Sequence, residues 1–190
     1  MNSLALRLAP LLAVLVFAGC ANIKLDATGA TPATVEKLRS ARLAPAQVGA
    51  FRLAPGKDPA MDTSLSGLRG NSLAPAKGTW SQLLKDTVLA ELTAAGLVDP
   101  ASSLVIEGLL TDSKVDAAIG TGTGRLAARF IVKNGSRVAY DKELAVDAQW
   151  ESSFVGAVAI PAAMNQYGAL YKSLVAKLVD DPDFRRALTK

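Results

Sequence analysis

The side chain best placed to carry chemistry in this sequence is the thiol of Cys20, the only cysteine in the chain. It directly follows Ala18 and Gly19, which close a short apolar run over residues 8–17, and Arg7 supplies one positive charge before that run. A charged start, an apolar core and small residues before the cut are the three parts of a secretion signal. A cysteine at this point is typical of a bacterial lipoprotein processing site. The pattern predicts a diacylglyceryl group on the thiol and cleavage that makes Cys20 the first residue of the mature chain.

Two other interpretations of this leader are weaker. A buried core helix would have no reason to place its only thiol after Ala-Gly, and the apolar run is shorter than the roughly 20 residues that span a membrane. An ordinary secreted protein with one cysteine would carry an unpaired thiol into an oxidising compartment. Lipidation removes that liability, and two or more acyl chains anchor a protein stably. Ala21 stands where inner-membrane lipoproteins commonly carry aspartate, so the general sorting pattern implies the outer membrane and its periplasmic face.

The rest of the sequence offers little for catalysis. Histidine is absent from all 190 residues, which removes His-based triads, His general bases and nearly all zinc sites. No Ser-x-x-Lys or Gly-x-Ser-x-Gly motif supplies a serine nucleophile. Asp112 and Asp116, or Asp180, Asp181 and Asp183, lack the alternating ligands and central glycine of a calcium loop and are interpreted as solvated charges. We therefore predict a protein that is not an enzyme and holds no metal or cofactor beyond its acyl chains.

Nucleic acids and nucleotides are also poor candidates as ligands. The formal net charge is +4, or +3 once Arg7 leaves with the leader, and the lysines and arginines are scattered along the chain. Such scattering does not form the basic stripe that follows a phosphate backbone. The three glycines within residues 120–124 precede a strand pattern, whereas a phosphate-binding loop needs a helix directly after it. We interpret this stretch as a flexible connection between strands.

Periodicity and end signals predict an α+β domain. A short helix is expected near residues 31–41, and residues 56–78 are expected to form a long, partly mobile loop with one extended piece near 66–68. The remaining predicted elements are a strand over 48–53, a helix over 79–97, strands over 103–118, 125–133 and 137–147, and a helix over 161–180. The predicted fold is an antiparallel sheet of about four strands with two long helices on one face, in the order β-α-β-β-β-α. The predicted divisions are a signal peptide over 1–19, a lipidated tether over 20–44 and a single periplasmic domain over 45–190.

Two details of these elements can be tested by a structure. The helix over 79–97 has a capping box of Thr79 and Gln82 and a stop at Gly96, while Glu91 falls inside its apolar stripe. That carboxylate is expected to pair with an arginine at the edge of the buried face, or else to face a ligand. The Asn-Gly pair at 134–135 predicts a hairpin.

The apolar pattern also predicts the register of this hairpin. Pairing Val132 with Val138 and Phe130 with Tyr140 keeps apolar side chains together on one face of the sheet. This register requires a three-residue loop or a bulge beside the turn.

The segment over residues 150–161 is unusually apolar for the connection between a strand and a helix. Connections normally lie in water and are polar. One interpretation is that the segment folds under the domain as a lid on the core. The other is a partner-docking surface with Trp150, Phe154 and Val155 as anchors, because aromatic side chains dominate interface energies.

The lipobox, the helix that Thr79-Trp80 opens, the Gly-Arg-Leu-Ala-Ala-Arg-Phe strand and the run from Trp150 to Pro161 resemble a group of uncharacterised proteobacterial outer-membrane lipoproteins. This resemblance covers roughly residues 45–188. More loosely, the layout is similar to ABC-transport auxiliary lipoproteins and to small helper lipoproteins of envelope assembly. The resemblance implies an outer-membrane accessory role in lipid or glycan traffic, with no catalytic residues to carry over.

Three hypotheses about function follow from the sequence. The leading one is a non-enzymatic, lipid-anchored periplasmic domain that docks on another envelope protein. The second is a carrier that shelters a lipid or small apolar ligand between sheet and helices. The third is a hydrolase without histidine, for which Glu91, Asp112 and Asp116 are the acids that the sequence offers.

Overall fold

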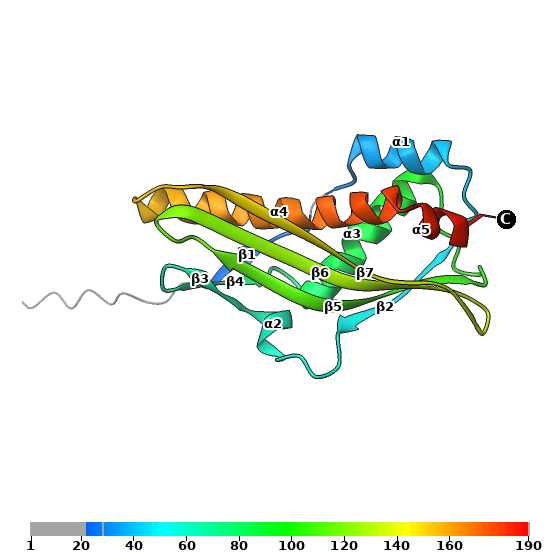
Figure 1. Ribbon diagram of the computed structural model, residues 1–190, viewed down its shortest axis with the longest axis horizontal. Coiled ribbons are helices and arrows are strands. Elements are labelled where there is room, and N and C mark those ends of the chain that lie inside the picture. Colours follow the sequence, from blue (N-terminus) through cyan, green and yellow to red (C-terminus); the bar gives the residue numbers. More distant parts are fainter. Residues whose placement is uncertain (1–21, 28, 190) are drawn as a thin grey trace, which may run out of the picture.

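The computed structural model describes residues 22–27 and 29–189, and these form an α+β fold of two sheets and five helices (Figure 1). Within this part of the chain, no helix combines the length and the apolarity needed to cross a bilayer. The helices are α1 (Pro32–Ser40), α2 (Ala60–Thr63), α3 (Trp80–Ala95), α4 (Gly156–Asp180) and α5 (Pro182–Ala187). The strands are β1 (Asn22–Leu25), β2 (Gln47–Leu53), β3 (Leu65–Leu68), β4 (Asn71–Pro75), β5 (Leu104–Asp116), β6 (Gly120–Asn134) and β7 (Arg137–Ser152).

The larger sheet has the strand order β2-β5-β6-β7 and is mixed, not wholly antiparallel as predicted. Strands β5, β6 and β7 follow one another as an antiparallel meander. Strand β2 instead pairs with β5 in parallel. The chain between β2 and β5 contains helix α3, and a crossover through a helix returns the next strand in the same direction.

Helices α3 and α4 pack side by side against this sheet, and α1 lies over both helices (Figure 1). The core is therefore a layer of side chains between the sheet and the two long helices. At its centre, the fully buried ring of Trp80 meets Tyr167 nearly edge-on at 5.2 Å between ring centroids. The Tyr167 hydroxyl bonds the hydroxyls of Ser113 (2.6 Å) and Tyr171 (3.1 Å). Burial raises the pKa of both tyrosines, so these hydroxyls stay neutral and tie strand β5 to helix α4.

The ends of helix α3 confirm the predicted N-cap at Thr79 and the stop at Gly96. The Gln82 side chain bonds Asp86 at 2.7 Å instead of completing a capping box. The Thr79 side chain accepts a hydrogen bond from the Gln82 N–H, and Gly96 closes the helix in the left-handed conformation with φ +76°. Helix α4 begins at Gly156, five residues before the predicted start, so Pro161 lies inside it. The Val155 carbonyl accepts bonds from the next turn, which starts the helix before the proline is reached.

A second sheet, with the order β1-β4-β3, was not foreseen from the sequence. Residues 22–25 were expected to form part of a tether, yet they make strand β1, which runs parallel to β4. Residues 56–78 were expected to be a loop, yet they hold α2, β3 and β4, and only the extended piece near 66–68 was predicted. Arg69 (φ +54°) and Gly70 (φ +86°) form the tight turn between β3 and β4. Two residues of positive φ are the requirement of the commonest hairpin turn, and Arg-Gly is a weak sequence signal for it.

The predicted hairpin at 134–135 is present with a bulge beside the turn, as expected. Its register differs from the prediction. Ala139 is the extra residue, so Val132 pairs with Tyr140 and not with Val138. The error is two residues along β7, and because the side-chain period of a strand is also two, the apolar side chains keep the predicted face.

The glycine-rich stretch over residues 120–124 is not a flexible connection, because it forms the first third of strand β6. A Cβ built on Gly122 would lie 2.2 Å from the Trp150 ring on the neighbouring strand. Because Gly122 has no side chain, the Trp150 indole has room beside it. Glycine inside a strand commonly marks such a close approach.

Candidate functional site

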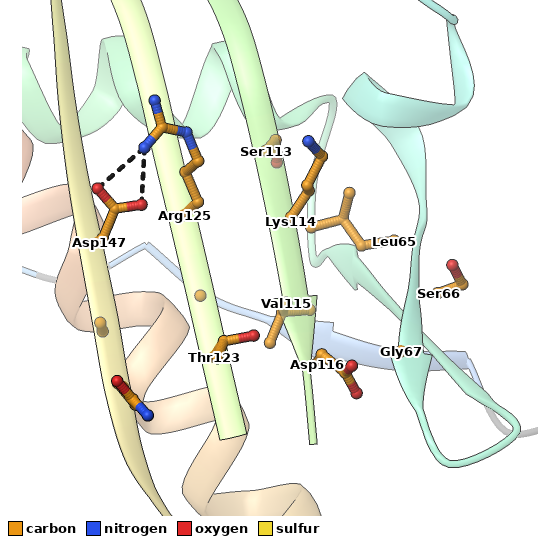
Figure 2. Close-up of a pocket in the computed structure, with 13 residues that line it drawn as sticks. Leu65, Ser66, Gly67, Ser113, Lys114, Val115, Asp116, Thr123, Arg125 and Asp147 are labelled. Carbon is orange, nitrogen blue, oxygen red and sulfur yellow. Dashed lines mark hydrogen bonds and ion pairs between the residues drawn. The ribbon is translucent and has the colours of Figure 1, made fainter. Parts of the chain in front are cut away.

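A groove of about 780 Å³ lies beside strand β3 (Figure 2). Its floor is the face of β5, β6 and β7 that carries the charged side chains, and β3 forms one wall. Side chains alternate along a strand, so the polar residues at every second position of these strands line the groove while their neighbours fill the core. The lining includes residues of β3 and polar residues of β5, β6 and β7: Ser66, Gly67, Lys114, Asp116, Arg125, Asp147 and Gln149.

An ion-pair network lies across the floor of the groove, which the paired strands β5, β6 and β7 form. The Arg125 guanidinium on β6 joins the two neighbouring strands. Its Nη1 lies 2.7 Å from the Asp147 carboxylate (Figure 2), and its Nε lies 3.2 Å from Asp112. The hydrogen bond and charge of Asp147 raise the pKa of Arg125 further. Lys114 lies 3.3 Å from Asp112, but its side chain is 73% exposed. Exposed pairs of this kind contribute little to stability, so the lysine remains available to a ligand.

The wall of the groove is fixed by backbone contact between β3 and the end of β5. The Ala117 N–H donates to the Gly67 carbonyl at 2.8 Å. A Cβ built on Gly67 would lie 2.0 Å from the Val115 carbonyl oxygen, and Gly67 has φ +108°. Only glycine permits both this conformation and this approach. The sequence shows that residue 67 is glycine, but it does not show that strand β5 packs so closely here that only glycine fits.

The predicted lipid-attachment residue, Cys20, lies outside the described residues. The three predicted docking residues lie within them and have different environments. Trp150 is on strand β7, half-buried, with its ring over Gly122 and against the core. Phe154 and Val155 lie in the short link between β7 and α4, and their side chains are largely exposed. Of the apolar segment over 150–161, only residues 153–155 connect the two elements; the rest belongs to the strand or the helix.

Two of the three acids that the sequence offered for chemistry, Glu91 and Asp112, bind other residues of the fold, and the side chain of the third, Asp116, does not within the described part of the chain. Glu91 is buried, and its Oε1 accepts the Thr31 N–H at 2.8 Å. It therefore ties the first turn of α1 to α3, and the expected arginine is not its partner among the described residues. A carboxylate at the start of a helix is also favoured by the helix dipole. Asp112 pairs with Arg125, and Asp116 stands at the exposed end of the groove floor.

The interpretation of Asp181 as a solvated helix-end charge is wrong. Its side chain is 5% exposed and begins helix α5 by accepting the Asp183 N–H at 2.9 Å. Lys142 lies 2.7 Å from Oδ2, and the Tyr140 hydroxyl donates to the same oxygen at 3.2 Å. Burial alone would raise the pKa of Asp181, but the bonds from Lys142, Asp183 and Tyr140 outweigh burial and lower that pKa below its usual value.

This arrangement predicts a pH-dependent loss on replacing Asp181→Asn. A carboxylate whose pKa is lower in the folded than in the unfolded state, where it is about 3.9, stabilises the fold above that pH. That stability disappears as pH falls through the folded pKa. We expect the Asn variant to lose about 1–3 kcal/mol at pH 7, and the difference from wild type to shrink towards pH 3.

Urea unfolding at pH 7, 5 and 3 measures the Asp181 effect. Asp180→Asn is the matched control, because Asp180 is half-exposed and, within residues 22–27 and 29–189, its ion-pair partner is the half-exposed Lys37. The control should lose less than about 1 kcal/mol at every pH. If the difference in unfolding free energy between wild type and Asp181→Asn stayed constant with pH, the lowered pKa of Asp181 in the folded state would be contradicted.

No known family model matches the sequence, and no curated protein matches it. Among solved structures, protein XCC0632 from Xanthomonas campestris, of family DUF330, matches 82% of this chain and 94% of its own, with 14% identity and a TM-score of 0.53. A candidate lipoprotein from Caulobacter crescentus CB15 matches 81% of this chain and 93% of its own, at 12% identity and TM-score 0.46. The hypothetical protein CT253 from Chlamydia trachomatis matches 72% of this chain and 96% of its own, with 13% identity and a TM-score of 0.34. The likeness to the Xanthomonas protein shows that this chain shares the fold of a DUF330 protein.

Proposed function

We propose that this protein is a non-enzymatic binding domain, anchored through acyl chains on Cys20 at the periplasmic face of the outer membrane, that docks an envelope protein. The groove beside β3 is the observation that supports this function. It is preformed, because the Gly67 contact fixes its wall and the pairing of β5, β6 and β7 fixes its floor. A rigid, open groove suits an extended segment of a partner chain.

The groove lining mixes charged and apolar side chains, which favours a protein segment over a wholly apolar ligand. Lys114 and Asp116 present both charge signs, and Ser66 and Gln149 add hydrogen-bonding groups. The space that the carrier hypothesis would need, between the sheet and the helices, is occupied by fully buried side chains, Trp80 and Tyr167 among them. A carrier would have to displace this packed layer, which is costly because protein interiors are close-packed.

The hydrolase hypothesis also has little geometric support. Glu91 is buried under helix α1 and Asp112 is committed to Arg125, so neither is presented to a substrate. Asp116 stands in the groove without an ion-pair partner among residues 22–27 and 29–189. One isolated exposed carboxylate does not make the acid–base pair that hydrolysis needs.

Site-specific photocrosslinking in intact cells tests docking in the groove. A photoreactive residue at Ser66 or at Gln149, on opposite sides of the groove, should give an adduct with the same partner protein. Glu36 on helix α1 is the matched control position, since it is exposed but remote from the groove. Equal adducts at Glu36, or no adduct at both groove positions, would contradict the proposal.

Charge reversal then tests the chemistry of the groove. Lys114→Glu and Asp116→Arg should each reduce the Gln149 adduct by about tenfold if one ion pair to the partner is lost, which corresponds to about 1.4 kcal/mol. Lys57→Glu makes the same change at an exposed lysine outside the groove and should leave the adduct unchanged. An effect of all three variants alike would point to net charge and not to the groove.

A further inference from the structure

Four exposed apolar side chains gather at one end of the molecule, and we call them the apolar tip: Ile119, Phe154, Val155 and Val158. Their exposed fractions are 63%, 79%, 55% and 58%. Ile119 lies in the turn between β5 and β6, and the other three lie in the link before α4 and in its first turn. Gly120 pairs with Ser152, so the turn and the link are neighbours. Exposed apolar groups that cluster in this way mark an interaction surface.

The apolar tip is held rigidly by one arginine from the second sheet. Arg69, in the turn between β3 and β4, donates from Nε to the Ala117 carbonyl at 2.7 Å. Its Nη1 donates to the Phe154 carbonyl at 2.8 Å, and its Nη2 to the Ser153 carbonyl. Three connections from distant parts of the sequence are thus joined at their backbones. The tip is therefore a preformed surface and pays little ordering entropy on contact.

The predicted anchor leaves the domain at this same end. Asn22, the first described residue, pairs with Ser72, which follows the Arg69 turn by three residues. In Figure 1, β3, β4 and the start of α4 lie at one end of the molecule and α5 at the other. One residue separates Cys20 from Asn22, and two Cα steps reach about 7 Å at most. Acyl chains on Cys20 would therefore enter the bilayer beside the Arg69 turn.

We propose that the apolar tip inserts into the interfacial region of the same leaflet that holds the acyl chains of Cys20. This inference rests on the anchor in the proposed function but not on the groove. Because only one residue separates Cys20 from Asn22, the anchor would hold the tip at the bilayer surface whatever else the domain binds. Lipid is therefore the proposed occupant, and not a partner protein. Apolar side chains at an interface add their burial to that of the acyl chains.

The consequence of insertion is a fixed orientation. An acyl chain alone is a single point about which the domain could turn. Ile119 and Phe154, on two different connections, would add further points of contact with the membrane. The strands of the larger sheet would then run at a steep angle to the membrane plane. The hairpin end of that sheet, where Val138 lies, would then be the part farthest from the bilayer, because β7 runs the length of the sheet between Val138 and the tip.

Depth-resolved fluorescence of the full lipidated protein tests the inference. The native thiol is acylated, so single cysteines at Phe154→Cys, Val158→Cys or Val138→Cys can each carry an environment-sensitive nitrobenzoxadiazole probe. Val138 is the matched control, since it is also an exposed apolar residue, at 53%, but lies at the opposite end of β7. The vesicles contain phosphatidylethanolamine and phosphatidylglycerol, with and without nitroxide-labelled lipid.

Insertion predicts a blue-shifted emission at positions 154 and 158 that nitroxide lipid quenches, and an unshifted, unquenched emission at 138. If the protein floated with the vesicles but gave the same emission at all three positions, insertion of the apolar tip would be wrong, while the lipid anchor at Cys20 would still be supported. A blue shift that nitroxide lipid does not quench would show that the tip meets protein, which also overturns the inference. A wild-type protein that does not float with vesicles would overturn the anchor itself, and the tip with it.

Discussion

Replacing Gly67 with alanine is expected to separate strand β3 from strand β5 and to destabilise the domain by about 3 kcal/mol. The new Cβ would stand 2.0 Å from the Val115 carbonyl oxygen, which belongs to the backbone of a central strand and cannot rotate away. The residue would also have to keep φ +108°, a region that side chains rarely adopt. Urea unfolding followed by circular dichroism measures the loss.

Gly56→Ala separates the clash from the backbone strain in this experiment. Gly56 also has positive φ, at +77°, but nothing lies within 4 Å of its Cβ position. Its replacement should cost only the conformational penalty, about 1–2 kcal/mol. The Gly67 variant should in addition lose the photocrosslink at Ser66, because the wall of the groove has moved. Equal losses of stability in the two variants, with the crosslink retained, would show that the wall does not depend on this contact.

Trp80→Ala is expected to have the largest effect on stability of any single truncation in the core, about 3–5 kcal/mol. Its ring is fully buried between α3 and α4 and contacts Tyr167 and Tyr171. The cavity would open at the centre of the layer, where the surrounding elements are least free to close it. Since domains of this size are stable by about 5–15 kcal/mol in total, the variant should unfold at markedly lower urea concentration.

Trp150→Ala is the matched comparison and also addresses the lid interpretation of the 150–161 segment. Trp150 is half-buried over Gly122 at the edge of the sheet, so its truncation should cost less, about 2 kcal/mol. A larger loss from Trp150 than from Trp80 would contradict the packing described here. A Trp150 variant with wild-type stability would reopen the docking interpretation for that residue.

Much of the secondary structure could be predicted because its signals are local. Helix α3 begins at a threonine that bonds its own helix and ends at a left-handed glycine, both within one turn of the element. The bulge beside the 134–135 turn followed from keeping apolar side chains on one face. The exact partners in that hairpin did not follow, because a two-residue slip preserves the pattern on which the prediction depended.

The candidate site could be predicted only in its parts. Asp116 was interpreted as a solvated charge, and it does lie exposed, but the grouping of Lys114 and Asp116 with Arg125 depends on the pairing of β5 with β6. The wall of the groove comes from β3, which has four residues and is too short to show periodicity. The apolar tip likewise joins residues 119 and 154, which the pairing of β6 with β7 and the bonds of Arg69 bring together.

The sequence by itself determined the predicted anchor at Cys20, the lack of histidine chemistry, the α+β class and the capped ends of α3, because each rests on residue types and short spacings. The tertiary structure alone decided that residues 22–25 form a strand, that Glu91 ties down helix α1 and that Trp150 and Phe154 have different environments. The physical reason is that burial and partnership are properties of contacts between residues far apart in the chain. Local patterns limit those contacts to one face of an element, and the packing of whole elements selects the partners.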